Sequence, residues 1–235
     1  MSRYSTITSG TKQIKRLRKT RQAVSKVLPA TRLQMLFLVS TLVILLWSNI
    51  MPKDRLTWLM EVAPVLIALP LLTYTWQSFP LTPLLYKLIF IHVVILMIGG
   101  HYTYAEVPAG FWVQDLFGLE RNNYDRLGHF VQGFVPAILA REILLRKTLL
   151  QPGKMLFYII TSIVLAFSAF YEMLEWWAAL LYGGAADAFL STQGDVWDTQ
   201  WDMFTALIGA ISAQLLLSKR HNKQLKEVLK VSFLT

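Results

Sequence analysis

The chain has 235 residues, 54% of them hydrophobic, a net charge of +9 and a mean hydropathy of +0.44. Soluble domains are usually less apolar, so the long apolar runs predict membrane-spanning helices. The chain has no cysteine, which excludes disulfides and thiolate metal sites. We interpret the positive charge as a signal for membrane orientation, with no nucleic acid as partner.

The N-terminal residues 1–32 hold nine Lys or Arg and no acidic residue, which predicts a basic cytoplasmic tail, with a transit peptide as the alternative. Apolar segments then predict an all-α polytopic membrane protein, a bundle of six transmembrane helices over residues 33–217. The expected spans are roughly 33–50, 58–76, 84–100, 126–145, 155–181 and 198–217. Residues 110–117 predict a short amphipathic helix in the membrane interface. Residues 218–235 predict a second basic cytoplasmic tail.

The charged residues are distributed unevenly between the two sides of this expected bundle. With six spans and a cytoplasmic N-terminus, 19 of the 23 Lys and Arg fall on the cytoplasmic side, and 12 of the 14 acids fall in the outer half. This distribution follows the positive-inside rule, and five or seven spans would break it. It predicts a multi-pass protein with both termini in the cytoplasm and the lipid bilayer as its partner.

Acidic residues and one histidine recur near the outer ends of the last three expected spans. They are Asp125 and His129 in the fourth span, Glu172 and Glu175 in the fifth, and Asp195, Asp198 and Asp202 at the start of the sixth. A charge placed centrally in a span costs about 2.5–3.5 kcal/mol, so such acids are expected to be protonated, paired or hydrated. We expect the seven side chains to line one polar cavity that faces outward.

Carboxylates and imidazole are ligands for Zn²⁺, Mn²⁺, Mg²⁺ or Fe²⁺, which makes a divalent metal the candidate cofactor. We assign the candidate metal ligands and the candidate catalytic acid/base groups separately. The candidate ligands are Asp125, His129, Asp195 and Asp198, and the candidate catalytic groups are Glu172, Glu175 and Asp202. Without a metal, acids this close would share protons and suit a relay.

Structural interpretations of the same residues stay open. Glu172 and Glu175 would instead form a buried ion pair with Arg121 or Arg126. Helix capping accounts for one or two of the acids that begin the sixth span.

Other polar residues of the spans have ordinary expected roles. Glu61 would reach the interface, His92 would form an interhelical hydrogen bond, and His101 would be an interfacial or hydrogen-bonded histidine. Small residues in the sixth span, among them Ala206 and Gly209, predict close approach of a neighbouring helix.

Four stretches of the sequence resemble the YjdF family of bacterial inner-membrane proteins. They are GHYTYAEVP at 100–108, RNNYDRLGHF at 121–130, YEMLEWW at 171–177 and TQGDVWDTQWDM at 192–203. The resemblance covers about residues 33–217 and implies a six-span inner-membrane protein, without supplying a reaction. A more distant similarity is to VanZ-like membrane proteins, on the run from Asp125 to Phe130. Ala206 stands where that group has Asn, which weakens transfer of an envelope role.

Three functions fit these patterns. The first is a metal-dependent or acid/base site acting on a lipid or envelope substrate, with a small-molecule or lipid ligand at the outer leaflet. The second is a proton-coupled transporter that uses Glu172 and Glu175 as its relay. The third is a non-catalytic envelope or partner-binding protein whose acids are structural. Neither the substrate nor the oligomeric state follows from the sequence.

Overall fold

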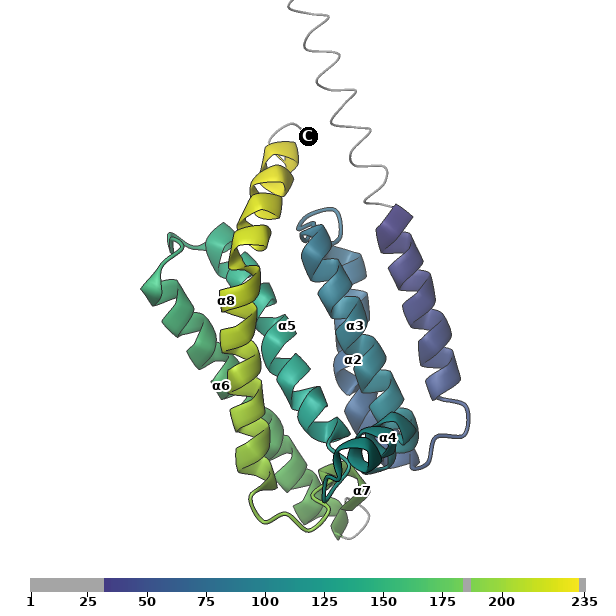
Figure 1. Ribbon diagram of the computed structural model, residues 1–235. Coiled ribbons are helices and arrows are strands. Elements are labelled where there is room, and N and C mark those ends of the chain that lie inside the picture. The colour runs from purple at the N-terminus through teal and green to yellow at the C-terminus, as the bar shows by residue number, and fades with distance from the viewer. Residues whose placement is uncertain (1–31, 184–186, 233–235) are drawn as a thin grey trace, which may run out of the picture.

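The computed structural model describes residues 32–183 and 187–232, and its helices run roughly side by side as a bundle (Figure 1). The predicted tail at residues 1–32 lies outside the described residues except for Arg32. The helices are Arg32–Ser48, α2 (Arg55–Thr75), α3 (Pro83–Tyr102), η1 (Tyr104–Glu106), α4 (Pro108–Phe117), α5 (Tyr124–Lys147), α6 (Lys154–Tyr182), α7 (Asp187–Leu190) and α8 (Asp198–Ser232). No strand occurs in the described ranges, so the all-α prediction is confirmed there.

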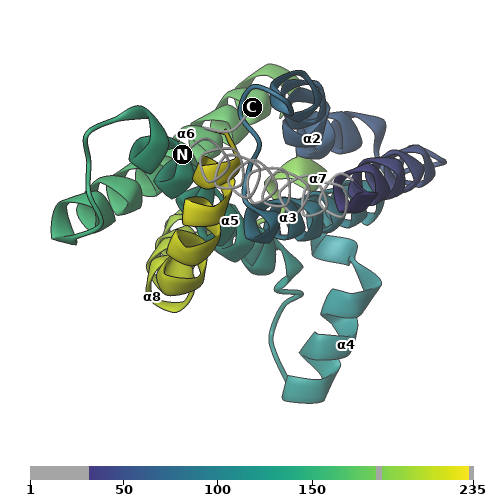
Figure 2. The same ribbon diagram turned by 90° about the horizontal axis from the view of Figure 1, so that it is seen from above.

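Four of the described helices, α2, α3, α6 and α8, have the length and apolar composition needed to cross a membrane. The helix Arg32–Ser48 is apolar but shorter. Helix α5 is more polar, and it lies between α3 on one side and α6 and α8 on the other (Figures 1 and 2). Burial among other helices allows a polar segment to lie at membrane depth. Four helices thus meet the criteria for a span, and the count of six remains a prediction.

The two ends of the bundle differ in charge. We call the end with α4, α7 and the start of α8 the acidic end, and the end with the α2–α3 and α5–α6 turns the basic end. Side chains cap the starts of two of the helices, α2 and α3. Asp54 accepts a hydrogen bond from the Thr57 amide and caps α2, while Thr82 caps α3 ahead of Pro83.

Glycines bring α5 and α8 into close contact. A Cβ added at Gly133 would overlap the Ala206 carbonyl oxygen, and one added at Gly209 would overlap the Phe130 carbonyl oxygen. Ala206 and its neighbour Ala210 are fully buried in this contact. The prediction of a small-residue packing face on this helix is confirmed.

Helix α8 continues well beyond the predicted end of its span at residue 217, as far as Ser232. The additional turns are held at the basic end, where His221 Nε2 lies 3.0 Å from Glu142 Oε2 and both residues are fully buried. Glu142 also accepts hydrogen bonds from Thr82 Oγ1 at 2.8 Å and from Arg146 Nη1 at 3.0 Å. The end of α8 is therefore fixed to the turns that begin α3 and end α5.

Helix α4 projects sideways from the bundle at the acidic end (Figure 2). Its exposed residues include Trp112, Leu116 and Phe117. The predicted helix at 110–117 is present, with two additional residues at its start. Its placement in the membrane interface stays a prediction.

Candidate functional site

The chain turns sharply before α8, and this turn decides the direction of Asp195. Gln193 and Gly194 both have positive φ, and the Asp195 amide donates to the Thr192 carbonyl at 2.9 Å. The Asp195 carboxylate accepts a hydrogen bond from the Trp197 amide at 2.9 Å. Because α8 begins at Asp198, Asp195 lies outside the helix and does not share a helical face with Asp198 and Asp202.

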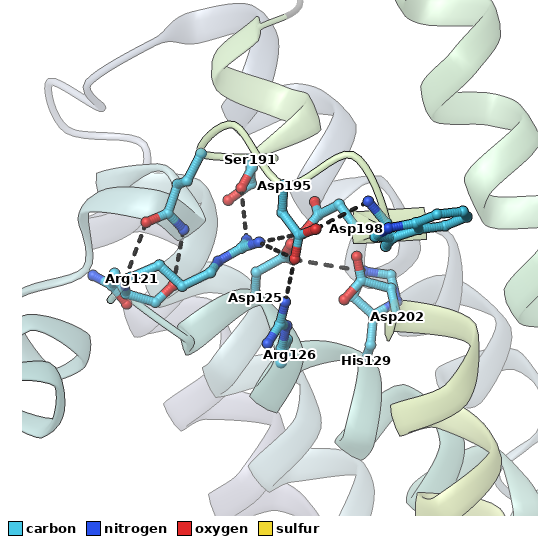
Figure 3. Close-up of polar contacts among 11 residues, drawn as sticks. Arg121, Asp125, Arg126, His129, Ser191, Asp195, Asp198 and Asp202 are labelled. Carbon is cyan, nitrogen blue, oxygen red and sulfur yellow. Dashed lines mark hydrogen bonds and ion pairs between the residues drawn. The ribbon is translucent and has the colours of Figure 1, made fainter. Parts of the chain in front are cut away.

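Two arginines from the α4–α5 region meet the acids of this turn, in what we call the arginine cluster: Arg121, Arg126, Asp195 and Asp198 (Figure 3). Arg121 Nη1 lies 2.5 Å from Asp198 Oδ1, and Arg126 Nη2 lies 2.6 Å from Asp195 Oδ2. Arg121 Nη2 also donates to the Ser191 carbonyl at 3.0 Å. The arginines therefore pair with Asp195 and Asp198, and the predicted alternative pairing with Glu172 or Glu175 is not found among the described residues.

The remaining predicted acids lie next to His129, in what we call the histidine cluster: Asp125, His129, Glu172, Glu175 and Asp202. All five residues are less than 9% exposed. Helices α5, α6 and α8 supply them, which places charged groups from three separate segments at one depth. The cluster is largely buried, and its residues line neither the hollow beside α2 and α3 nor the one at the start of α8.

The imidazole of His129 lies at the centre of this cluster and faces acids on both of its edges. Nε2 lies 3.5 Å from Asp125 Oδ1 and 4.0 Å from Asp202 Oδ2, while Nδ1 lies 3.6 Å from Glu172 Oε1. These separations exceed normal hydrogen-bond lengths. The groups therefore point at one another without bonding directly.

Several buried polar atoms of the cluster have no hydrogen-bond partner among the described residues. These atoms are His129 Nδ1, Glu172 Oε1 and Asp202 Oδ1. An unpaired buried polar atom costs about 1–3 kcal/mol, and more when it is charged. The arrangement is therefore one that a cation or shared protons would stabilise.

Two overlapping triads of side chains have the spacing of metal ligands. Asp125, His129 and Asp202 form one, and His129, Glu172 and Glu175 form the other, with the ligand atoms of each triad within 4.8 Å of one another. Ligands bonded to a tetrahedral metal at about 2.1 Å lie about 3.4 Å apart. A small contraction of either triad would therefore produce a coordination site.

The sequence interpretation missed Glu61, which extends this acidic region onto α2. Glu61 was expected to reach the interface, but it is 4% exposed, so that prediction is wrong. Tyr171 Oη donates to Glu61 Oε2 at 3.5 Å, and the Tyr171 ring lies 6.2 Å from the His129 ring. Val62 and Val65 are also buried. An acidic residue next to apolar positions of one helix face was therefore the sequence pattern that could have indicated the burial of Glu61.

Tyr104 packs beside Glu61 from the 3-10 helix. A Cβ at Gly99 or Gly128 would lie less than 3 Å from the Tyr104 ring, so these glycines make room for it. Burial, with an additional contribution from the charge of Glu61, raises the pKa of the Tyr104 hydroxyl well above its usual range. Tyr104 therefore stays a neutral hydrogen-bond donor.

The two histidines of α3, His92 and His101, differ in their surroundings. His101 Nδ1 lies 3.1 Å from the Ser48 carbonyl, and its ring packs 4.5 Å from that of Trp47, which confirms a hydrogen-bonded histidine. His92 Nε2 is buried and bonds to no described residue. The predicted interhelical hydrogen bond is not found at this atom.

Comparisons with known proteins identify relatives of the chain. The profile described as "Predicted membrane protein (DUF2238)" matches residues 33–223. The inner membrane protein YjdF of Escherichia coli (strain K12) is 56% identical over 183 residues, which is 78% of this chain and 88% of that protein. No solved structure matches significantly. The matched range includes every residue of the arginine and histidine clusters.

Proposed function

The chain belongs to the DUF2238 family of membrane proteins, as its resemblance to YjdF indicated, and we propose that its histidine cluster binds one divalent cation. The observation that carries this proposal is the set of buried, unpartnered nitrogen and oxygen atoms around His129. A cluster of acidic residues alone does not indicate a cation site. A nearly buried imidazole with acids on both edges adds the independent feature that points to a ligand.

The distances around the imidazole favour one arrangement of ligands. Asp125 and Asp202 both face Nε2, whereas Glu172 faces Nδ1. Metal-binding histidines commonly donate their second N–H to a carboxylate, which fixes the ring and increases its basicity. We therefore assign Asp125, His129 and Asp202 as metal ligands and Glu172 as the residue that orients His129.

This assignment changes the roles that the sequence suggested. Asp195 and Asp198 were candidate ligands, but their ion pairs with Arg121 and Arg126 give them a structural role at the turn that leads into α8. Asp202, a candidate acid/base group, becomes a ligand. A carboxylate oxygen of Glu175 lies within 4.8 Å of ligand atoms of Glu172 and His129, so Glu175 keeps the role of acid/base group beside the metal.

Three protein ligands leave a fourth position for water or substrate, as in catalytic zinc sites. A metal in this site would lower the pKa of bound water and polarise a substrate oxygen, and Glu175 would accept the proton. The site lies at the acidic end of a membrane protein, so we assign it a lipid or envelope substrate at the outer leaflet. The corresponding localisation is the bacterial inner membrane, with both termini in the cytoplasm.

Metal analysis of the purified full-length protein tests this assignment. After equilibration with Zn²⁺ or Mn²⁺ and removal of free metal, plasma mass spectrometry should find about one ion per chain, as one four-coordinate site holds. His129→Ala and Asp202→Asn should lose the ion. Glu172→Gln should weaken binding about 10–100-fold, as expected for an orienting carboxylate.

Asp195→Asn is the matched control, because it removes a carboxylate at the same end of the bundle but in the arginine cluster. It should keep the wild-type metal content, and gel filtration should show that every variant is folded. Metal-free wild-type protein after equilibration, or full metal content in His129→Ala, would show that the proposal is wrong and leave a structural role for the acids.

Proton-coupled transport is a second candidate, favoured by buried polar residues between the two ends of the bundle. Gln132, Ser168 and Gln214 are buried, and Gln214 Nε2 donates to Thr161 Oγ1 at 3.0 Å. They lie along α5, α6 and α8, between the histidine cluster and the Glu142–His221 pair. Proton flux into liposomes that is lost in Gln214→Leu but kept in Gln200→Leu would favour this function over a metal site.

A further inference from the structure

An apolar groove lies between the helix Arg32–Ser48 and helices α2 and α3, and no residue of the histidine cluster lines it. Its cavity volume is about 70 Å³, and it is partly open to the outside of the bundle. Its walls include Phe37, Thr41, Val65, Leu72, Tyr86 and Phe90. Most of these positions lie in the half of their helix nearer the basic end, and Thr41 and Val65 lie near the middle of theirs.

The groove results from how the helix Arg32–Ser48 is attached. At the acidic end, Trp58 Nε1 donates to Ser48 Oγ at 3.1 Å, and the Ser48 carbonyl lies 3.1 Å from His101 Nδ1. Toward the basic end, the Phe37 and Phe90 rings stack with centroids 4.8 Å apart. The helix is therefore held by hydrogen bonds at one end and by aromatic contact at the other, and space remains beside the aromatic pair.

The surroundings of the groove determine what can fill it. Its walls are apolar helices of a membrane protein, and such a space neither holds nor attracts water. A hydrocarbon chain from the surrounding bilayer has the matching chemistry. Its headgroup would then lie at the basic end of the bundle.

Basic side chains stand where that headgroup would lie. Arg32 begins the first wall helix, and Lys87 lies one turn before Phe90 on α3. Both residues are exposed, and neither forms an ion pair with a carboxylate of residues 32–183 or 187–232. Basic residues near the cytoplasmic ends of spans attract anionic lipids.

We propose that this groove binds one acyl chain of an anionic phospholipid whose headgroup contacts Lys87 and Arg32. The site is separate from the histidine cluster and does not depend on the metal. It makes the protein a specific lipid binder at the basic end, whatever chemistry occurs at the acidic end.

Photolabelling of the wild-type protein tests where the lipid lies. The full-length protein is reconstituted into phosphatidylcholine vesicles containing a small fraction of phosphatidylglycerol with a diazirine near the end of one acyl chain. After irradiation, mass spectrometry should find the labels concentrated on residues 34–41, 65–76 and 86–93. Labels spread evenly over the exposed helix faces would show that the groove holds no specific lipid.

Variants test the groove and the headgroup contact separately. Ala68 lines the groove, so Ala68→Trp should abolish labelling there. Ile67 is 68% exposed on the neighbouring outer face, so Ile67→Trp should leave the photolabelling of the groove unchanged. Lys87→Gln should reduce the preference for phosphatidylglycerol over phosphatidylcholine about fivefold, the contribution of one basic side chain near an anionic lipid.

Two results would overturn the proposal. One is equal labelling of the groove by phosphatidylcholine and phosphatidylglycerol probes in the wild type, which would indicate an adventitious lipid only. The other is unchanged groove labelling in a folded Ala68→Trp variant. Because the labelling pattern is measured on the wild type, the test still decides if a variant fails to fold.

Discussion

At the scale of single residues, Arg121 joins a buried carboxylate of α8 to the loop that precedes that helix. It neutralises Asp198, which is 4% exposed, and holds the Ser191 carbonyl of the preceding loop. Arg121→Ala leaves a buried carboxylate without a partner, so it should lower the free energy of unfolding by about 3 kcal/mol. Denaturant titration in detergent micelles, followed by tryptophan fluorescence, measures this change.

An exposed ion pair at the same end of the bundle supplies the control. Lys53 pairs with Glu106, and both side chains are nearly half exposed. Lys53→Ala should therefore change stability by less than about 1 kcal/mol. If Arg121→Ala and Lys53→Ala lowered the free energy of unfolding equally, burial would not be what makes the ion pairs of the arginine cluster important for stability.

Sequence reasoning found most residues of the two clusters but not how they divide. Asp125 and His129 share a helix face by spacing alone, and the structure keeps them 3.5 Å apart. The division depends on Arg121, whose long side chain reaches acids more than 70 positions away in the sequence. Glu61 was given a different role because its contacts with Tyr171 of α6 and Tyr104 of the 3-10 helix join segments far apart in the sequence.

At the scale of helices, the packing of α5 on α8 depends on glycines. Gly133 allows the Ala206 backbone to come within contact of α5, with no room for a Cβ. Gly133→Ala should therefore separate the helices and lower the free energy of unfolding by about 1–3 kcal/mol, as overpacking does. The same denaturant titration in micelles measures this loss.

Gly153 is the matched control for that substitution. The nearest atom to a Cβ at Gly153 is the Gln151 carbonyl oxygen at 4.0 Å, and its φ of 167° is extended backbone that alanine adopts. Gly153→Ala should stay within about 0.5 kcal/mol of the wild type. A Gly133→Ala variant as stable as this control would contradict the close packing of the two helices.

The starts and ends of most helices followed from the sequence, whereas the end of α8 did not. The fourth and fifth spans were predicted within two residues at each end, because apolar runs between turn residues define them. Residues after 217 are rich in Lys and were interpreted as a tail. The buried His221 and Leu225 show an amphipathic continuation that packs on the basic end.

At the scale of the whole molecule, composition alone led to the correct class and the motifs led to the family. The sequence predicts a span over residues 126–145, but α5 is less apolar than the four helices that meet the criteria for a span. Burial among neighbouring helices would allow its polar groups to lie at membrane depth. The apolar character of α5 is reduced by Asp125 and His129 of the histidine cluster and also by Gln132, Arg141 and Glu142. The count of spans is therefore less determined by the sequence than the fold class is.

The orientation of the bundle gives the last prediction. The basic end carries most of the Lys and Arg of the described chain, and the positive-inside rule places it in the cytoplasm. Green fluorescent protein fused after residue 235 should therefore fluoresce. Alkaline phosphatase needs disulfides, which form in the periplasm, so its insertion at Gly118 in the α4–α5 loop should give an active enzyme.

The two reporters must give opposite results for this topology to hold. Gly118 is a suitable insertion point because a side chain there would meet no atom within 4 Å. Phosphatase activity from a fusion at residue 235, with no activity at Gly118, would reverse the orientation. The histidine cluster would then lie on the cytoplasmic side, where an outer-leaflet substrate could not reach it. Orientation thus decides which leaflet can supply a substrate to the proposed metal site.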